Sequence, residues 1–553
     1  MNNLNERINE WIQSLGAVKK WKSARPLGPL YALIITAIFG AVMEWFALIP
    51  LNLRSVEFIS FAIFLLLVYV FLAVVFTARF NAFVKLPLFL AAALFFYSVF
   101  GGLTGLKIFN ADRYQTQLLL DSTADFYADN EAISFNAIPV VDRQSSIVLG
   151  DRKMGEIVDY VSQFEVNQDY IQINYKNTPY RVTPLEYTDL IRWFTNRKNG
   201  LPAYITVNMV TQKVAVVDLE QGMKYSESEP LFRNIYRHLR FNYPTLMFEE
   251  LSFEIDEEGT PYYIAPVYNY TIGIFGGKDI VGAVLVNAID GSSEYYDILE
   301  VPTWVDRIYP ASLINQQLIN WGKYKNGFFN SVLAQKGVLQ PTEGYNYVAL
   351  NDDVYFYTGL TSATSDASNV GFALVNLRTK DAKYYGISGA EEFSAMSSAE
   401  GQVQHLGYNA TFPILINSSG VPTYFLSLKD NANLVKKYAF VSVENYQIVA
   451  TGDSVLAAQT AYVQLLKENG ILNGGDGAIG DVTTIEGVVS EISSAVIEGN
   501  STYYFKLEGQ NLIFISDISL NSGLPLLKAG QEVAVSYMAT DDISVVISTL
   551  EIK

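Results

Sequence analysis

Three long apolar runs near the N-terminus constrain this chain most. They cover residues 27–48, 58–78 and 86–106, and each is close to the roughly 20 residues that an α-helix needs to cross a bilayer. Buried core helices are the alternative, but three such runs so close together favour a membrane domain. The first run is also too long for the apolar part of a cleavable signal peptide. We therefore predict three transmembrane helices within a membrane domain of residues 27–107.

Basic residues flank these runs unevenly. Four lie just before the first run and two lie between the second and third, whereas the first loop carries only Arg54. Because basic residues are retained on the cytoplasmic side, residues 1–26 are predicted to be cytoplasmic. Three crossings then place everything after residue 107 outside the cell, so we expect a multi-pass protein of the cell membrane with an extracellular body.

The charge balance separates these two parts. Residues 1–107 carry nine Lys and Arg against four Asp and Glu, whereas the remainder carries 29 against 52. Nucleic-acid binding depends largely on cationic charge. The acidic body therefore makes nucleic acid an unexpected partner, and the lipid bilayer is the first partner that the sequence predicts.

A Gly-x-Pro phrase recurs in the body. It reads "GLPAYITV" at 200–207, "GTPYYIAPV" at 259–267 and "GVPTYFLSL" at 420–428. Glycine supplies a turn, and proline lacks the donor that a central strand needs, so it belongs at a strand start or on an edge. We predict that each copy marks a hairpin turn entering a strand. The aromatic residues after it are free to serve recognition, and Tyr262 and Tyr263 are the first candidates for a recognition site.

A second phrase reads Val-Asn, then a turn, then another strand. It occurs at 207–219, 286–298 and 375–387, with a weaker version at 441–453. Such hairpins bury one face and expose the other. Helices are expected between them from apolar residues at helical spacing, at 154–164, 230–241, 311–322 and 389–406. The body is therefore predicted to be α+β, with units at 108–220, 221–345 and 346–472.

A helix, a hairpin and then "AVLVNAIDGSSEYYDI" (283–298) resemble a PepSY domain. The resemblance covers about 230–300, with weaker cover over 150–220 and 350–460. The layout as a whole resembles multi-pass membrane proteins of Gram-positive bacteria with large outside domains. Such a resemblance implies an inhibitory or regulatory role at the cell envelope. It supplies no catalytic residues.

The C-terminal tail reads as a separate domain. "NGGDGAIGD" at 473–481 has the composition of a flexible linker, which we place at 473–482. Five alternating strands follow over 483–553, with a short helical insert between the third and fourth. This arrangement resembles an OB-fold β-barrel, a class that binds oligonucleotides or oligosaccharides or mediates contacts. Nucleic acid is disfavoured because the tail has only three lysines and no basic groove.

Catalytic and metal-binding signatures are not found in the sequence. There is no cysteine, and His238 and His405 are too far apart for a HExxH motif. No Gly-x-Ser-x-Gly occurs. Asp256, Glu257 and Glu258 could ligate calcium, but a solvated turn explains them better. We therefore predict no catalytic residue, no metal ligand and no cofactor.

These observations lead to one functional expectation and two alternatives. The expectation is a non-enzymatic, membrane-anchored protein that binds, scaffolds or regulates at the bacterial cell envelope, with envelope proteins or a cell-wall polymer as partners. The first alternative is a hydrolase acting on the cell wall, a glycosidase or a peptidase. The second is a component of a secretion or conjugation complex. The ligand and the oligomeric state do not follow from the sequence.

Overall fold

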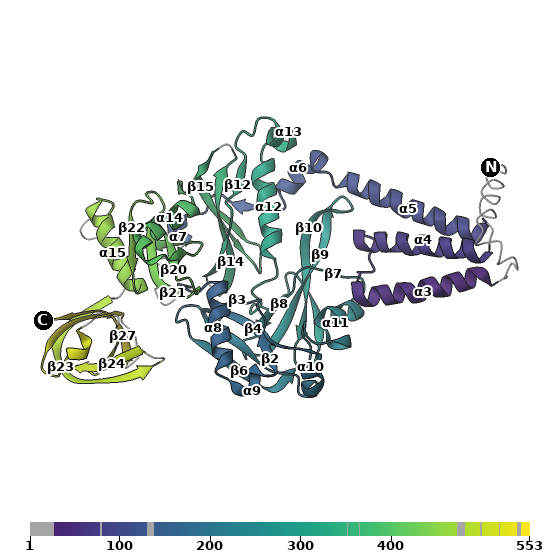
Figure 1. Ribbon diagram of the computed structural model, residues 1–553. Helices are drawn as coiled ribbons and strands as arrows, with labels where there is room; N and C mark the ends of the chain where they lie inside the picture. Colours follow the sequence, from purple (N-terminus) through teal and green to yellow (C-terminus); the bar gives the residue numbers. More distant parts are fainter. Residues whose placement is uncertain are drawn as a thin grey trace.

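A computed structural model describes residues 27–553 except 78–79, 130–137, 351, 364, 473–481, 498–499, 519, 522 and 539–543. Three helices form one end of the molecule, an α+β body follows, and a small β-barrel ends the chain (Figure 1). The mixed α+β class predicted from the sequence is confirmed. The segment 1–26 and nearly all of the predicted linker at 473–482 lie outside the described residues.

The three apolar runs form helices α3 (Gly28–Ala47), α4 (Val56–Thr77) and α5 (Ala82–Thr104). Each is long and apolar enough to cross a membrane, and many of their large apolar side chains are exposed. A Cβ atom added at Gly40 of α3 would lie 2.9 Å from Leu65 of α4. Small residues let membrane helices approach closely in this way. The prediction of three membrane helices is confirmed at the level of length and composition.

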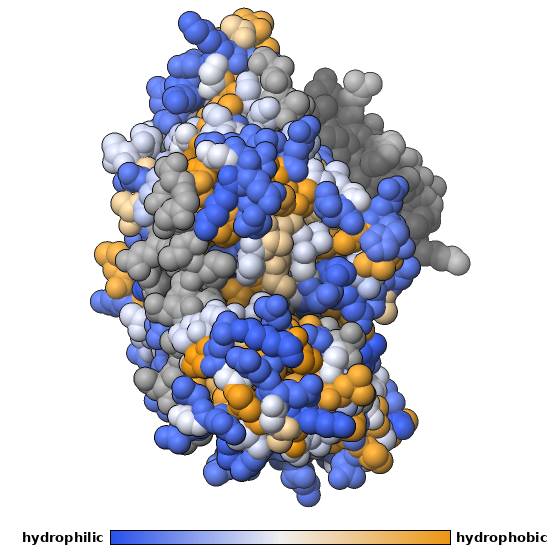
Figure 2. All heavy atoms as spheres, turned by 90° about the vertical axis from the view of Figure 1, so that its left-hand side faces the viewer, coloured by the Kyte–Doolittle hydropathy of each residue, from blue (hydrophilic) through white to orange (hydrophobic). Residues whose placement is uncertain are grey.

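The face of the molecule turned away from these helices is more hydrophilic than the helices (Figure 2). Hydrophilic residues cover much of it and are mixed with smaller hydrophobic patches (Figure 2). Such a mixed surface is typical of protein in contact with water.

Among the described residues, the body contains four sheets that share one order of five antiparallel strands. In each sheet, the first and second strands are short, and both pair with the long third strand. The fourth strand pairs with the third, and the fifth pairs with the fourth. The first short strand pairs with the end of the long strand and the second pairs with its beginning. We call these sheets, with the helix before each, the first to fourth units.

The strands of the first two units are β2 (Phe164–Val166), β3 (Ile171–Tyr175), β4 (Thr178–Tyr187), β5 (Leu201–Asn208) and β6 (Val214–Met223), then β7 (Met247–Phe248), β8 (Ser252–Ile255), β9 (Pro261–Ile272), β10 (Gly276–Asn287) and β11 (Ser293–Asp297). Those of the last two are β12 (Leu339–Pro341), β13 (Asn346–Leu350), β14 (Asp353–Ser362), β15 (Ser365–Asn376) and β16 (Ala382–Tyr385), then β18 (Asn409–Ala410), β19 (Ile414–Ser418), β20 (Val421–Lys429), β21 (Val435–Ser442) and β22 (Val449–Gly452). The third sheet also takes up β1 (Leu120–Asp121) and β17 (Gly389–Ala390). The last unit predicted from the sequence, at 346–472, therefore contains the whole fourth unit and strands β13 to β16 of the third.

The Val-Asn phrase occupies the same place in all four units, the turn between the fourth and fifth strands. The Gly-x-Pro phrase does not. Gly259 and Gly420 have positive φ at the turn before the long third strand, as predicted. Gly200 instead lies between helix α10 (Leu190–Asn196) and the fourth strand, which begins at Leu201, so the hairpin prediction is wrong there. The counterpart in the first unit is Asn177, also at positive φ, before Thr178 and Pro179.

The helices before the sheets are α8 (Arg143–Gly155) and α9 (Val158–Val161), η2 (Leu231–Arg233) and α11 (Ile235–Asn242), α12 (Ala311–Tyr324) and α13 (Gly327–Val332), and α14 (Glu392–Gln402) and η3 (Gln404–Leu406). Helices α6 (Lys107–Gln115) and α7 (Phe126–Asp129) precede the first unit, and α15 (Val455–Glu468) follows the fourth. The helix predicted at 311–322 is confirmed. The helix predicted at 154–164 is wrong as a single element: α8 ends at Gly155, α9 has four residues, and Phe164 already belongs to β2.

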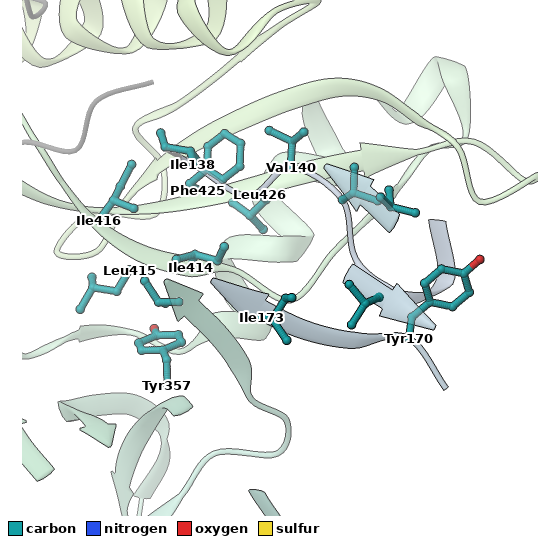
Figure 3. Close-up of a cluster of buried hydrophobic side chains, with 14 of the residues drawn as sticks. Ile138, Val140, Tyr170, Ile173, Tyr357, Ile414, Leu415, Ile416, Phe425 and Leu426 are labelled. Atoms are coloured by element: carbon teal, nitrogen blue, oxygen red, sulfur yellow. The ribbon is translucent and has the colours of Figure 1, made fainter. Parts of the chain in front are cut away.

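The units share their hydrophobic core. Side chains of the first, third and fourth units meet in one buried cluster, among them Val140, Ile173, Tyr357 and Phe425 (Figure 3). The hydroxyl of Ser427 donates to the carbonyl oxygen of Val140 at 2.7 Å. The segment that contains Val140, at the beginning of the body, is therefore hydrogen-bonded to the sheet of the fourth unit.

The second unit docks on the membrane helices through the β9–β10 hairpin. A Cβ atom at Gly101 of α5 would lie 2.2 Å from the ring of Phe275 at the hairpin tip. The ring of Tyr97 meets Phe275 edge-on at 5.9 Å, and the amide of Ile274 donates to the Thr104 hydroxyl at 3.2 Å. Only a residue without a side chain fits at position 101.

The tail forms a closed barrel in the order β23-β24-β25-β27-β26. Its strands are β23 (Val482–Ile497), β24 (Asn500–Leu507), β25 (Ile513–Asp517), β26 (Glu532–Met538) and β27 (Ser544–Ile552), and η4 (Leu524–Leu526) lies between the third and fourth. The long β23 pairs with both β24 and β26, and β25 and β27 are parallel. The barrel has its own core, separate from that of the body.

Candidate functional site

A cavity of about 670 Å³ lies where the four units converge. Its lining includes Asp142 and Arg181 of the first unit, Tyr263 of the second, Tyr347 of the third and Phe412 of the fourth. Ligand pockets have volumes of roughly 300–1,000 Å³ and few polar groups at fixed places. The size and the convergence of units make this cavity the candidate binding site.

Arg181 is the most unusual residue of this cavity. It lies on β4 among five consecutive buried positions and is only 5% exposed. Its Nη1 donates to the Tyr170 carbonyl oxygen at 3.2 Å, while its Nε has no partner. Burial lowers the pKa of Arg181 to about 10, and Asp142 opposes that shift. A buried guanidinium without a carboxylate partner costs stability, so a negative ligand group would be stabilised beside it.

Arg307 is a second guanidinium at the cavity. Its Nη2 donates to the Tyr347 hydroxyl at 2.8 Å, and the guanidinium lies 4.6 Å from the centre of that ring. Burial would lower the pKa of Arg307, but Tyr347 and Glu254 outweigh it, so the pKa is raised. Arg307 therefore stays charged. The stacking orients its planar fork, the geometry that binds carboxylates and phosphates.

Glu254 fixes the backbone from which Arg307 projects. This carboxylate is fully buried on β8 and accepts from the amides of Asp306 (2.8 Å) and Arg307 (3.2 Å) and from the Ser252 hydroxyl (2.8 Å). Asp306 in turn accepts from the amide of Asn174 in the first unit at 2.6 Å. Burial and the charge of Glu254 raise the pKa of Asp306 well above its usual value. This cluster joins two units directly beside the cavity.

Ion pairs already occupy the rim beside the start of α8. Lys429 Nζ lies 2.6 Å from Asp142 Oδ2, and Arg143 pairs with Asp169. Although burial opposes it, the contacts with Lys429 and Ser145 lower the pKa of Asp142. These four charges are satisfied within the protein, so Arg181 and Arg307 remain as the cationic groups for a ligand.

Acidic and phenolic groups line another part of the cavity. Glu227 accepts from the Tyr236 hydroxyl at 2.8 Å, and burial raises its pKa. Glu250 is exposed, and no hydrogen bond or ion pair of its side chain is described. The hydroxyl of Tyr263 is buried without a hydrogen-bond partner, and burial, then Glu227, raises its pKa well above the usual value. The cavity therefore offers both cationic and acidic groups.

The structure separates the two tyrosines predicted for recognition. Tyr263 is 2% exposed and lines the cavity. Tyr262, its neighbour on β9, lies on the other face of the strand, where its ring packs at 5.1 Å from that of Trp304. Adjacent strand residues point to opposite faces, so the two cannot serve one site. Of the pair, only Tyr263 belongs to the candidate site.

The other polar residues considered in the sequence have structural surroundings. His238 Nε2 lies 2.9 Å from the Gly291 carbonyl oxygen, and its ring meets that of Tyr225 edge-on. His405 lies in η3. Asp256 accepts from the amides of Glu258 and Thr260 in the turn between β8 and β9. Among the described residues, no group of three His, Cys, Asp or Glu is placed to hold a metal ion.

Sequence reasoning did not identify Arg181 or Arg307. Both are single arginines with no motif around them, and the rest of the cavity comes from segments up to 270 positions apart. One signal was present: Arg181 interrupts "YRVTPL", a strand that is otherwise apolar enough to be buried. A charge in such a strand needs either a partner or a ligand.

Comparisons with known proteins add little to this site. No protein-family description matches the chain, and the curated proteins gave no match. A solved structure of dihydro-heme d1 dehydrogenase NirN in complex with DHE shares 8% identity, with a TM-score of 0.11, over 67% of this chain and 54% of that one. The chain thus spans about half of that protein, and the likeness carries no argument about fold or function.

Proposed function

We propose that this chain is a membrane-anchored binding protein of the cell envelope. Three helices anchor it, the body stands outside, and the central cavity holds a small ligand with a carboxylate or a similar oxyanion. The observation that carries this proposal is Arg181, a buried guanidinium at a cavity with no carboxylate partner among the described residues. Arg307 supports it as a second, oriented cation.

We propose a binding rather than a catalytic role for this cavity. Three of its carboxylates have partners within the protein: Asp142 with Lys429, Asp169 with Arg143, and Glu227 with Tyr236. A hydrolase that used two carboxylates would need one as an acid and one as a base or nucleophile. Carboxylates that are held in ion pairs or hydrogen bonds are poorly placed to act as acid, base or nucleophile. They suit the rigid lining of a binding cavity instead.

The repeated units and the tail bear on the class of protein that we propose. Four sheets of one strand order are in keeping with PepSY-like units. A five-stranded barrel with a helical turn between its third and fourth strands is in keeping with an OB fold. Within this proposal the body senses a ligand, and the barrel contacts an envelope protein or a cell-wall polymer.

Trialanine and trialanine amide test the proposal, because they differ only in the C-terminal carboxylate. We expect trialanine to raise the Tm of the full chain in lipid nanodiscs over a concentration series, and the amide to have little effect. Replacing Arg181 with methionine should weaken the response by about tenfold or more, since charge-assisted hydrogen bonds contribute roughly 1.5–3 kcal/mol.

Two controls separate binding from folding. Arg181→Met removes a buried charge that has no carboxylate in hydrogen-bond contact, so it should not lower the Tm of the free protein. Arg152→Met changes an exposed arginine of α8 away from the cavity and should leave the response unchanged. Equal responses to the acid and the amide, or an unchanged response in Arg181→Met, would overturn the proposed site.

A further inference from the structure

Six large apolar side chains are exposed beside the membrane helices. Their exposed fractions range from 49% to 70%, and they are Leu190, Ile191 and Phe194 of α10, Leu231 and Phe232 of η2, and Phe241 of α11. We call this surface the apolar foot. A soluble surface rarely gathers so many large apolar residues without a partner.

The foot continues directly from the end of the first membrane helix. Trp45, near the end of α3, lies 5.0 Å from the ring of Phe232 and 5.9 Å from that of Phe241. The guanidinium of Arg237 covers the Trp45 ring at 4.5 Å, and Arg240 Nε donates to the Leu48 carbonyl oxygen at 2.8 Å. Tryptophan at a helix end is typical of the membrane–water boundary.

Helix α10 is held to this part of the body by two hydrogen bonds. Arg233 Nη1 of η2 donates to the Arg197 carbonyl oxygen at 2.7 Å, and Trp193 Nε1 donates to Glu229 at 2.7 Å. Figure 1 shows α11 beside the end of α3, and α10 below α11 at the lower edge of the body. Helix α10 therefore lies next to η2, whose Phe232 contacts Trp45 of α3.

Basic residues accompany the foot, although the body as a whole is acidic. They are Arg192, which pairs with Asp189 at 3.0 Å, and Arg197, Lys198, Arg233 and Arg237. The guanidinium of Arg197 lies 4.1 Å from the centre of the Phe194 ring. Apolar side chains with neighbouring basic groups are the pattern of segments that lie in the membrane interface, where anionic lipids attract the cations.

We propose that the apolar foot is a second membrane contact, which inserts into the headgroup region of a bilayer containing anionic lipid. It lies where α3 leaves the membrane, so insertion needs no rearrangement of the body. Together with the docked hairpin of the second unit, it holds the cavity at a fixed orientation to the membrane surface. This inference does not depend on which ligand the cavity binds.

The chain has no cysteine, so single-cysteine labelling tests the contact directly. Ile191→Cys, Phe46→Cys and Leu526→Cys would each carry an NBD fluorophore, in full-length protein reconstituted into vesicles of neutral and anionic phospholipid. Ile191 on the foot is 69% exposed, Phe46 on α3 is 76% exposed and Leu526 on the barrel is 75% exposed, so the three positions are similarly accessible. Lipids with a nitroxide on the headgroup report contact with the interface in either orientation of the protein.

We expect strong quenching at position 191, as at position 46, and little at position 526. Quenching at 191 no greater than at 526 would overturn the proposal. So would a blue-shifted emission at 191 without lipid quenching, because that result indicates a protein partner instead. Phe194→Cys provides a second site if labelling at 191 disturbs the fold.

The charge requirement is tested in the same vesicles. Quenching at 191 should weaken when the anionic lipid is omitted, and Lys198→Gln together with Arg192→Gln should reduce the difference between the two lipid mixtures. Equal quenching in both mixtures would overturn the preference for anionic lipid.

Discussion

Replacing Glu254 with alanine is expected to destabilise the body by about 3–5 kcal/mol, the range for breaking a buried charged network. The substitution removes the acceptor for the Asp306 and Arg307 amides and for the Ser252 hydroxyl. It also releases the backbone that holds Arg307 at the cavity. The Tm of the full chain in nanodiscs, followed by tryptophan fluorescence, measures the effect.

Two further substitutions serve as controls for Glu254→Ala. Glu254→Gln keeps a side-chain oxygen that can accept from the Asp306 and Arg307 amides, so its effect should be clearly smaller. Glu257→Ala removes an exposed carboxylate three positions along the chain and should change the Tm little. A Tm for Glu254→Ala equal to that of Glu257→Ala would show that the junction of the units does not depend on this carboxylate.

Replacing Gly101 with leucine is expected to release the β9–β10 hairpin from the membrane helices. Its Cβ alone would lie 2.2 Å from the Phe275 ring, and Tyr97 and Tyr270 restrict the movement of that ring. Overpacking of this kind costs about 1–3 kcal/mol, which corresponds to roughly five- to 160-fold faster amide exchange where local opening limits it. Hydrogen exchange of residues 272–277, including the Ile274 amide, measures the effect.

Gly102 provides the control, because a Cβ atom there meets nothing within 4 Å. Gly102→Leu has the same helix and the same change in size, and it should leave the hairpin protected. Equal exchange in the two variants would contradict the proposed docking of the hairpin.

Local patterns in the sequence were enough to predict the membrane helices and the late hairpin of each unit. The apolar runs are continuous, and the Val-Asn turns need residues that only a few side chains provide. The first unit was harder to predict, because Asn177 takes the place that glycine holds at 259 and 420. Helix α8 reads "RQSSIVLGDRKMG" and lacks the apolar spacing of an amphipathic helix.

The cavity could not be predicted in the same way. Arg181, Tyr263, Arg307 and Phe412 come from four units, and their meeting depends on how the sheets pack against one another. The repeated Gly-x-Pro phrase predicts Tyr263 as a recognition residue, and the structure places it at the cavity. Its neighbour Tyr262 shared the same pattern, and strand alternation alone separates the two.

Labelling of intact cells tests most directly whether a binding body stands outside an anchored membrane domain. Cysteine at Leu299, which is 95% exposed on the body, and cysteine at Ser14 in the N-terminal segment would be treated with a membrane-impermeant maleimide. We predict that position 299 reacts in intact cells and that position 14 reacts only after lysis. Reaction at position 14 in intact cells, with position 299 protected until lysis, would contradict the account.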